Sequence, residues 1–385
     1  MLDTYKLIMK QTLLLLFFIT SSIGYTQNET TFEVKIDANM ENANDPEEKE
    51  IIALWTNYLQ SGEYQNVATT FWDTSQYRIP DYFLWMVDLR SLRTRTPKVQ
   101  CTILGIFAVE NGHYAVKTSL AHLTEDNTVV LEAILSVYAK KVNGQYLLVN
   151  SSQYHKDIWQ KKQVGNITYY IHPMHQFEEK DAVRMNVFNE EIAKKLRTSP
   201  ISFDYFVSSY SREIVRLLGY EYMSKIYIPG QTGGVADVQN RIVYAGNNST
   251  YYAHELVHNY TYELYPNANH FWLNEGFATY MGGSSGYDLE WHIQKLKAYV
   301  LENPDFEISL SELRGYIPNG QHNTEFRYVI GGIICKKVFE EHGMDGVIEG
   351  LRTVDTDEDF FKFIKEKLNI KEEDFSSYIK EIVVK

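Results

Sequence analysis

Residues 254–258 read HELVH, and residues 272–280 read WLNEGFATY. Placed on a helix, His254 and His258 project from the same face, one turn apart. Two imidazoles at this spacing can bind one zinc ion at about 2.0–2.1 Å each. Glu255 lies about 100° around the helix from His254, where it can reach a water on the metal without becoming a ligand. The first stretch is therefore typical of a metal site with an adjacent general base.

The surrounding sequence predicts that this helix is partly buried. Ser249 or Thr250 provides an N-cap, and Pro266 provides a natural end. Leu256 and Val257 are apolar and stand beside the polar residues of the motif. Burying two imidazoles and a carboxylate without a partner would be unfavourable, and a bound metal ion removes that difficulty.

A zinc ion in a catalytic site needs a third protein ligand and an open fourth position. Glu275 stands in the second stretch, with sixteen residues between it and His258. This interval leaves room for the end of the first helix, a loop and a second, antiparallel helix. We therefore expect one zinc ion per chain, bound by His254, His258 and Glu275, with Glu255 as the catalytic base.

HELVH followed by WLNEGFA closely resembles the gluzincin metallopeptidases, in particular the aminopeptidase N family, in which a WLNEGFA-like segment supplies the third ligand. The resemblance covers residues 201–385 and implies a mainly helical, thermolysin-like catalytic domain that hydrolyses peptide bonds. It also implies that Tyr328, in the Tyr-x-x-Gly segment ending at Gly331, stabilises the tetrahedral intermediate. His322 is the competing candidate, because thermolysin-like enzymes use a histidine for this task. Either side chain can donate a hydrogen bond to an oxyanion.

The chain departs from the aminopeptidases in two respects. Its spacing between the second histidine and the glutamate is shorter, and it has no counterpart of their Gly-x-Met-Glu-Asn strand, whose glutamate binds the free amino terminus of the substrate. The nearest stretch, residues 233–246, is expected to be an edge strand lining the cleft, and its only acid is Asp237. Two alternatives therefore stand beside a general peptidase. One is a true aminopeptidase, and the other is a secreted ligand-binding protein with a structural zinc site.

The rest of the sequence predicts an α+β fold with two domains, residues 45–175 and residues 180–385. Apolar residues recur at helical spacing over residues 47–72, and the period changes to two over residues 99–171. Asn-Gly pairs mark hairpin turns between the strands, as at Asn143-Gly144. A helix followed by a curved antiparallel sheet resembles the nuclear-transport-factor-like or SnoaL-like fold in its order of elements.

The first residues predict export from the cytoplasm. Lys6 and Lys10 precede an apolar run over residues 13–19, followed by small and polar residues, and this is the pattern of a signal peptide at residues 1–27. The run is too short to span a bilayer, and no later segment is apolar enough for stable membrane insertion. We therefore expect a secreted or periplasmic protein. The formal charge of −13 argues against nucleic acid as a partner, so the expected partner is a peptide or protein substrate.

Overall fold

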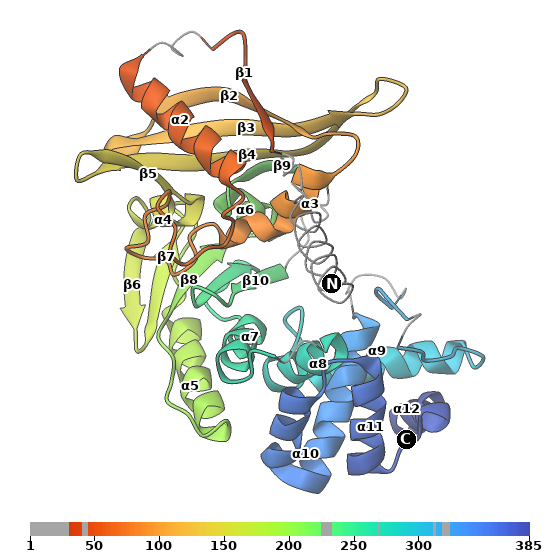
Figure 1. The fold of residues 1–385 in the computed structure, drawn as a ribbon. Helices are drawn as coiled ribbons and strands as arrows, with labels where there is room; N and C mark the ends of the chain where they lie inside the picture. Colours follow the sequence, from red (N-terminus) through yellow and green to blue (C-terminus); the bar gives the residue numbers. More distant parts are fainter. Residues whose placement is uncertain (1–30, 41–44, 225–232, 268–269, 311–312, 318–323) are drawn as a thin grey trace, which may run out of the picture.

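The protein is a mixed α and β structure, as the sequence predicts. Figure 1 shows the computed structural model, which describes residues 31–40, 45–224, 233–267, 270–310, 313–317 and 324–385. The expected signal peptide, residues 1–27, lies outside the described residues. Within the described ranges, none of the helices combines the length and apolar character that crossing a membrane requires.

The first sheet, called sheet A, is curved and mostly antiparallel. Its order is β1-β2-β3-β4-β5, and β9 pairs with β4 beside β5. Only β1 and β2 run parallel within this sheet, among the residues described. The strands are β1 (Glu33–Ile36), β2 (Gln100–Ala108), β3 (His113–Leu123), β4 (Val129–Val142), β5 (Gln145–Val149) and β9 (Tyr220–Met223).

Helix α2 (Pro46–Ser61) lies across one face of sheet A (Figure 1). The Asp45 side chain caps its start by accepting from two backbone N–H groups, and Trp55 and Tyr58 are fully buried beneath it. The helix ends at Ser61 because Gly62 adopts a left-handed φ of 74°. The expectation of a helix reaching residue 72 was therefore wrong.

The second sheet, called sheet B, has the order β10-β11-β8-β7-β6, with β10 at one edge. Its strands are β6 (Gln160–Val164), β7 (Ile167–Ile171), β8 (Phe203–Ser208), β10 (Gly233–Asp237) and β11 (Ile242–Gly246). Successive residues of a strand face opposite sides, so β8 buries Tyr205 in one core and Phe206 in the other. Sheet B is thus the layer that both hydrophobic cores share.

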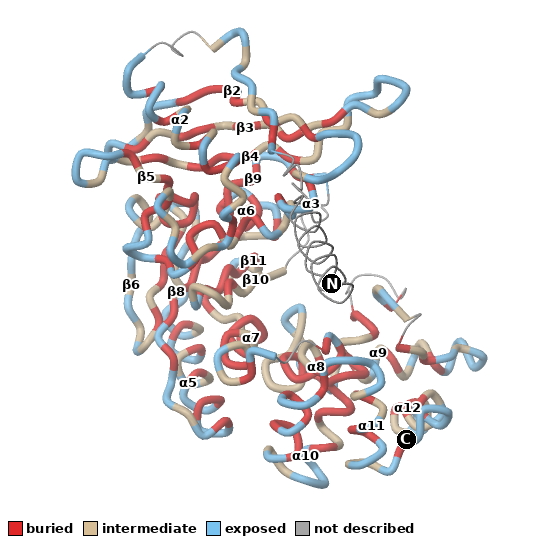
Figure 2. The backbone as a smooth tube through the Cα atoms, viewed as in Figure 1, coloured by how far each residue is buried: buried red, intermediate tan, exposed pale blue. Residues whose placement is uncertain are grey.

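The helices on the side of sheet B that faces away from sheet A build the lower part of the molecule in Figure 1. Figure 2 shows that buried residues line the sides on which α7, α8 and α10 face each other. The helices of the second half are α5 (Glu179–Lys195), α6 (Ser211–Leu217), α7 (Ala253–Leu264), α8 (Phe271–Gly282), α9 (Leu289–Glu302), α10 (Phe326–Thr353), α11 (Asp357–Leu368) and α12 (Phe375–Val384). Of these, α6 lies between the two sheets and packs into the core of sheet A. Shorter helices in the first half are η1 (Tyr82–Val87), α3 (Leu89–Thr94), η2 (Glu110–Gly112) and α4 (Ser151–Lys156), and η3 (Glu372–Asp374) precedes α12.

The sheets do not follow the expected domain boundary between residues 175 and 180. The strand at Ile167–Ile171 was expected in the curved sheet, but as β7 it pairs with β8 in sheet B. In return β9, which lies after the expected boundary, completes sheet A beside β4. The expected assignment of β7 was wrong, and the division into two domains stays a prediction.

Candidate metal centre

Helix α7 carries the HELVH stretch and lies below the edge strand β10 (Figure 1). It begins at Ala253 after Tyr252, and no side chain caps its N-terminus. The two residues expected to cap the helix have other partners. The Thr250 hydroxyl donates to the carbonyl oxygen of Glu178, and the Ser249 hydroxyl accepts from the backbone N–H of Tyr251. The cap prediction was therefore wrong, whereas the end of α7 just before Pro266 agrees with the sequence.

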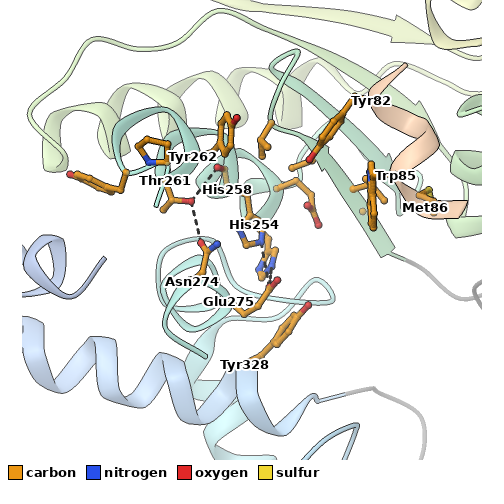
Figure 3. A pocket seen from close by; sticks show the side chains of 17 residues that line it. Tyr82, Trp85, Met86, His254, His258, Thr261, Tyr262, Asn274, Glu275 and Tyr328 are labelled. Atoms are coloured by element: carbon orange, nitrogen blue, oxygen red, sulfur yellow. Dashed lines mark hydrogen bonds and ion pairs between the residues drawn. The ribbon is translucent and has the colours of Figure 1, made fainter. Parts of the chain in front are cut away.

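The structure brings together the three residues that the sequence selects as ligands. The Nε2 atom of His254 lies 3.1 Å from Oε2 of Glu275, and that of His258 lies 3.4 Å from the same oxygen. Tetrahedral zinc with bonds of about 2.0–2.1 Å holds its ligand atoms roughly 3.3 Å apart. Both nitrogen–oxygen distances are therefore compatible with one metal ion bound by these residues, and all three candidate ligand atoms lie within 4.8 Å of one another (Figure 3).

A hydrogen bond on the far side of the His254 ring directs its Nε2 atom toward this point. The Nδ1 atom of His254 lies 2.7 Å from the carbonyl oxygen of Gly283. A carbonyl can only accept, so Nδ1 carries the proton and Nε2 presents its lone pair to the centre. The His258 ring hydrogen-bonds the Asn274 side chain, whose Oδ1 also accepts from the Thr261 hydroxyl at 3.1 Å.

Glycines allow the helices to approach closely enough to bring Glu275 to the histidines. A Cβ on Gly276 of α8 would overlap the backbone of Gly331 on α10, and a Cβ on Gly331 would overlap the carbonyl oxygen of Trp272. At the end of α8, a Cβ on Gly282 would lie 2.6 Å from the backbone nitrogen of His254. Helices α7, α8 and α10 are therefore in backbone contact around the site.

Glu255 lies beside the three residues and is 8% exposed. Its carboxylate accepts a hydrogen bond from the backbone N–H of Ala236, and its side chain packs against Gly234, where a Cβ would collide with it. Burial raises the pKa of Glu255. The two imidazoles lower this pKa and the nearby Glu275 charge raises it, so that the net shift is upward. A raised pKa suits a carboxylate that must accept a proton and release it again.

The centre favours positive charge. Burial alone would lower the pKa of His258, but the Glu275 carboxylate outweighs burial and raises this pKa to about 9. Burial likewise opposes ionisation of Glu275, yet His258 and His254 lower its pKa below the ordinary value. An ionised carboxylate in this buried group attracts positive charge, either a proton on an imidazole or a metal cation.

Tyr328 comes from the first turn of α10 and completes the group. Its ring stacks on that of His254, with centroids 5.6 Å apart and planes at 14°. Burial raises the pKa of Tyr328, and the Glu275 and Glu255 charges raise it further, so the phenol keeps its proton. The competing candidate, His322, lies outside the described residues.

All five of these residues line one cavity of about 320 Å³. Residues 233–246, expected to be one edge strand, form the two strands β10 and β11, and of these only β10 stands at the edge of sheet B. It lines the cavity through Gly234, Val235 and Ala236. Its acid, Asp237, does not line the cavity but bonds the Asn240 side chain instead.

Sequence reasoning missed several residues at this site. Tyr82, Trp85 and Met86 line the cavity from η1, far away in the sequence, and no local pattern connects them to it. Asn274 precedes Glu275 directly, so its place beside the histidines could have been inferred from the antiparallel helices. No protein-family model matches this chain, and no curated protein matches it either.

Proposed function

We propose that this protein is a secreted or periplasmic zinc-dependent peptidase of the gluzincin type. The observation that carries the proposal is the convergence of His254, His258 and Glu275 at the spacing of tetrahedral zinc ligands. Glu255 stands beside them in the same cavity, which is open to a substrate. A structural zinc site usually closes its fourth position with another Cys or His, and the described residues place no such side chain in this group.

The fold proposal follows from two resemblances, the gluzincin motifs of the second half and the order of elements in the first. Residues 180–385 form a gluzincin catalytic domain, and the preceding helix with its curved sheet forms a nuclear-transport-factor-like or SnoaL-like module. Helices α7 and α8 lie side by side, with β10 next to α7, and this arrangement supports the gluzincin part of the proposal.

A peptide substrate can bind along β10. One side of this strand pairs with β11, and the strand stands at the edge of sheet B and lines the cavity. An extended peptide can add to such an edge through main-chain hydrogen bonds, which places a peptide bond next to Glu255.

The proposed reaction is hydrolysis of that peptide bond. When bound, zinc supplies a Lewis acid that makes water more acidic and polarises a carbonyl group. Glu255 accepts a proton as the water oxygen attacks the carbonyl carbon, and it then delivers this proton to the departing amide nitrogen. The Tyr328 hydroxyl donates a hydrogen bond to the oxygen of the tetrahedral intermediate. The C–N bond breaks, and one water molecule is consumed.

The test is Glu255→Gln, which keeps the shape of the side chain but removes the proton acceptor. We expect the zinc content to remain at one per chain, while the rate at which library peptides are cleaved falls by ~10²–10⁴. Elemental analysis and a mass-spectrometric digest with and without chelator measure the two quantities. Glu263→Gln, on the same helix but exposed, is the matched control and keeps full activity. A fully active Glu255→Gln enzyme would contradict the proposal.

Free and N-blocked versions of one cleaved peptide separate a general peptidase from an aminopeptidase. The only acid of β10, Asp237, is buried and bonded to Asn240, so it does not offer a charge to a substrate amine. We therefore expect both versions to be cleaved.

A further inference from the structure

A short helix from the first half of the chain forms one wall of the cavity. Figure 3 shows Tyr82, Trp85 and Met86 on η1, across the cavity from the histidines and Glu275. Trp85 is 50% exposed, whereas Phe83 and Leu84 on the opposite side of the same helix are buried in the core of sheet A. Phe83 and Leu84 already attach η1 to the core, so the exposed indole of Trp85 is not needed for packing.

The chemistry of this wall differs from that of the metal centre. Among the described residues that line the cavity, four side chains are carboxylates or imidazoles. All four belong to the candidate metal centre: His254, Glu255, His258 and Glu275. The η1 side chains offer two aromatic faces and a thioether. Such a surface favours aromatic and large aliphatic groups through area burial, ring stacking and sulfur–aromatic contact.

Hydrogen bonds connect the segment just before η1 to the end of the edge strand, and the Tyr82 backbone N–H donates to the Ile79 carbonyl. The Asn240 side chain, in the turn after β10, makes two hydrogen bonds to the backbone of Ile79, at 3.0 and 3.1 Å. The same side chain donates to Asp237 at the end of β10, at 2.7 Å. We call Asp237, Asn240 and Ile79 the Asn240 clamp. The clamp fixes the distance between the strand that would hold a peptide main chain and the helix beside it.

Further hydrogen bonds hold η1 from its other side. The Asp81 carboxylate, just before η1, accepts from the Tyr58 hydroxyl at 2.7 Å, and the Tyr220 hydroxyl donates to the carbonyl oxygen of Phe83 at 2.7 Å. The Asn150 side chain donates to the carbonyl oxygen of Pro80 at 2.8 Å. A wall held at this many points is in place before a ligand arrives, which lowers the entropic cost of binding.

We infer that Tyr82, Trp85 and Met86 form the substrate-selecting wall of the cleft, which binds an aromatic or large aliphatic side chain of a peptide. This inference rests on the proposed function, because it assigns the substrate class of the same site. The module before the catalytic residues thereby determines which peptides are bound, and the Asn240 clamp positions it relative to β10.

The test measures binding separately from turnover. The probes are fluorescein-labelled blocked octapeptides of glycine, serine and alanine, with either one central phenylalanine or alanine at that position. Their dissociation constants are measured by fluorescence anisotropy on zinc-loaded protein carrying Glu255→Gln, which does not cleave them. We expect the phenylalanine peptide to bind roughly 10-fold more tightly, and Trp85→Ala to remove most of that difference. Phe107→Ala removes an aromatic side chain that is 51% exposed on β2 and outside the cavity, so it should leave the difference intact.

The outcomes distinguish this inference from the proposed function. If Trp85→Ala leaves the preference for phenylalanine unchanged, or if the protein with Trp85 shows no such preference, the wall does not select substrates. If Trp85→Ala removes the preference but the protein with Glu255 intact cleaves neither peptide, the inference stands and the proposed catalysis fails. Asn240→Ala tests the clamp: the affinity for phenylalanine should weaken while the zinc content stays at one per chain.

Discussion

His254 and His258 each have a partner besides Glu275. One nitrogen of each ring faces Glu275, the other nitrogen of His254 is held by the Gly283 carbonyl, and the His258 ring is also hydrogen-bonded to Asn274. Removing a ligand removes the metal site, whereas removing a group that only orients a ligand weakens it. The two kinds of residue can therefore be told apart by metal affinity.

We expect His258→Ala to lose its zinc on dialysis, and Asn274→Ala to bind zinc 10–100-fold more weakly, as is typical for partners of ligating histidines. Competition with a chromophoric chelator measures both affinities. His342→Ala, an exposed histidine on α10, serves as the control and keeps normal affinity. Unchanged zinc affinity in His258→Ala would place the metal elsewhere.

Tyr328 offers a second test at this scale. Tyr328→Phe keeps the ring that stacks on His254 but removes the donor, so kcat should fall by ~10²–10³ with little change in KM. Steady-state kinetics on one cleaved peptide measure this, and Tyr222→Phe, a partly exposed tyrosine of β9, is the control. If Tyr328→Phe is fully active and His322→Ala loses kcat instead, the donor is the histidine.

Among the elements, α8 and α10 depend most on close backbone approach. The Gly331 position leaves no space for a Cβ beside the Trp272 carbonyl, whereas a Cβ on its neighbour Gly332 would meet mainly a methyl group of Leu289, 2.6 Å away. A methyl group at the end of a side chain can move, and a backbone carbonyl cannot.

Gly331→Ala should therefore lower the free energy of unfolding by about 1–3 kcal/mol and displace Glu275 from the histidines. Gly332→Ala gains helix propensity of up to about 1 kcal/mol and should cost much less than its neighbour. Urea unfolding of both variants measures the difference. Equal stabilities would contradict the close packing of α8 against α10.

The sequence predicted some elements better than others. Helix α7 and the strands β2 to β5 carry strong periodicity and clear turn residues, such as Asn143 and Gly144, which both adopt positive φ. The start of α7 was misjudged because Thr250 bonds to the carbonyl of Glu178, a partner that no local pattern reveals. Tertiary contacts, rather than local capping, set that boundary.

At the scale of the whole molecule, the two sheets exchange strands across the expected domain boundary. A fragment of residues 180–385 would keep β8 but lose β7, its hydrogen-bonded neighbour, together with Tyr169 and Ile171 from the lower core. We expect this fragment to be aggregated or unfolded by size-exclusion chromatography and circular dichroism, because an open buried edge favours association.

The control for this prediction is a chain beginning at residue 31, which keeps both sheets and should unfold in a cooperative transition. A soluble fragment of residues 180–385 with its own cooperative transition would show that the second half folds alone.

The same exchange explains how far the candidate site could be read from the sequence. His254, Glu255, His258 and Glu275 lie on adjacent helices, where spacing alone predicts proximity. Trp85 reaches the cavity because the segment before η1 bonds to Asn240, far away in the sequence. Such a non-local contact leaves no periodic signal in the sequence.

Trp85 also gives the molecule an optical property. Of the six tryptophans in the chain, Trp85 is the most exposed, with half of its surface open to water; Trp159 and Trp291 are intermediate, and Trp55, Trp72 and Trp272 are buried. The Trp85 indole therefore emits at the longest wavelength, and a guest that displaces water from the cleft shifts that emission toward the blue. Occupancy of the cavity beside the candidate metal centre can therefore be followed by the intrinsic fluorescence of Trp85.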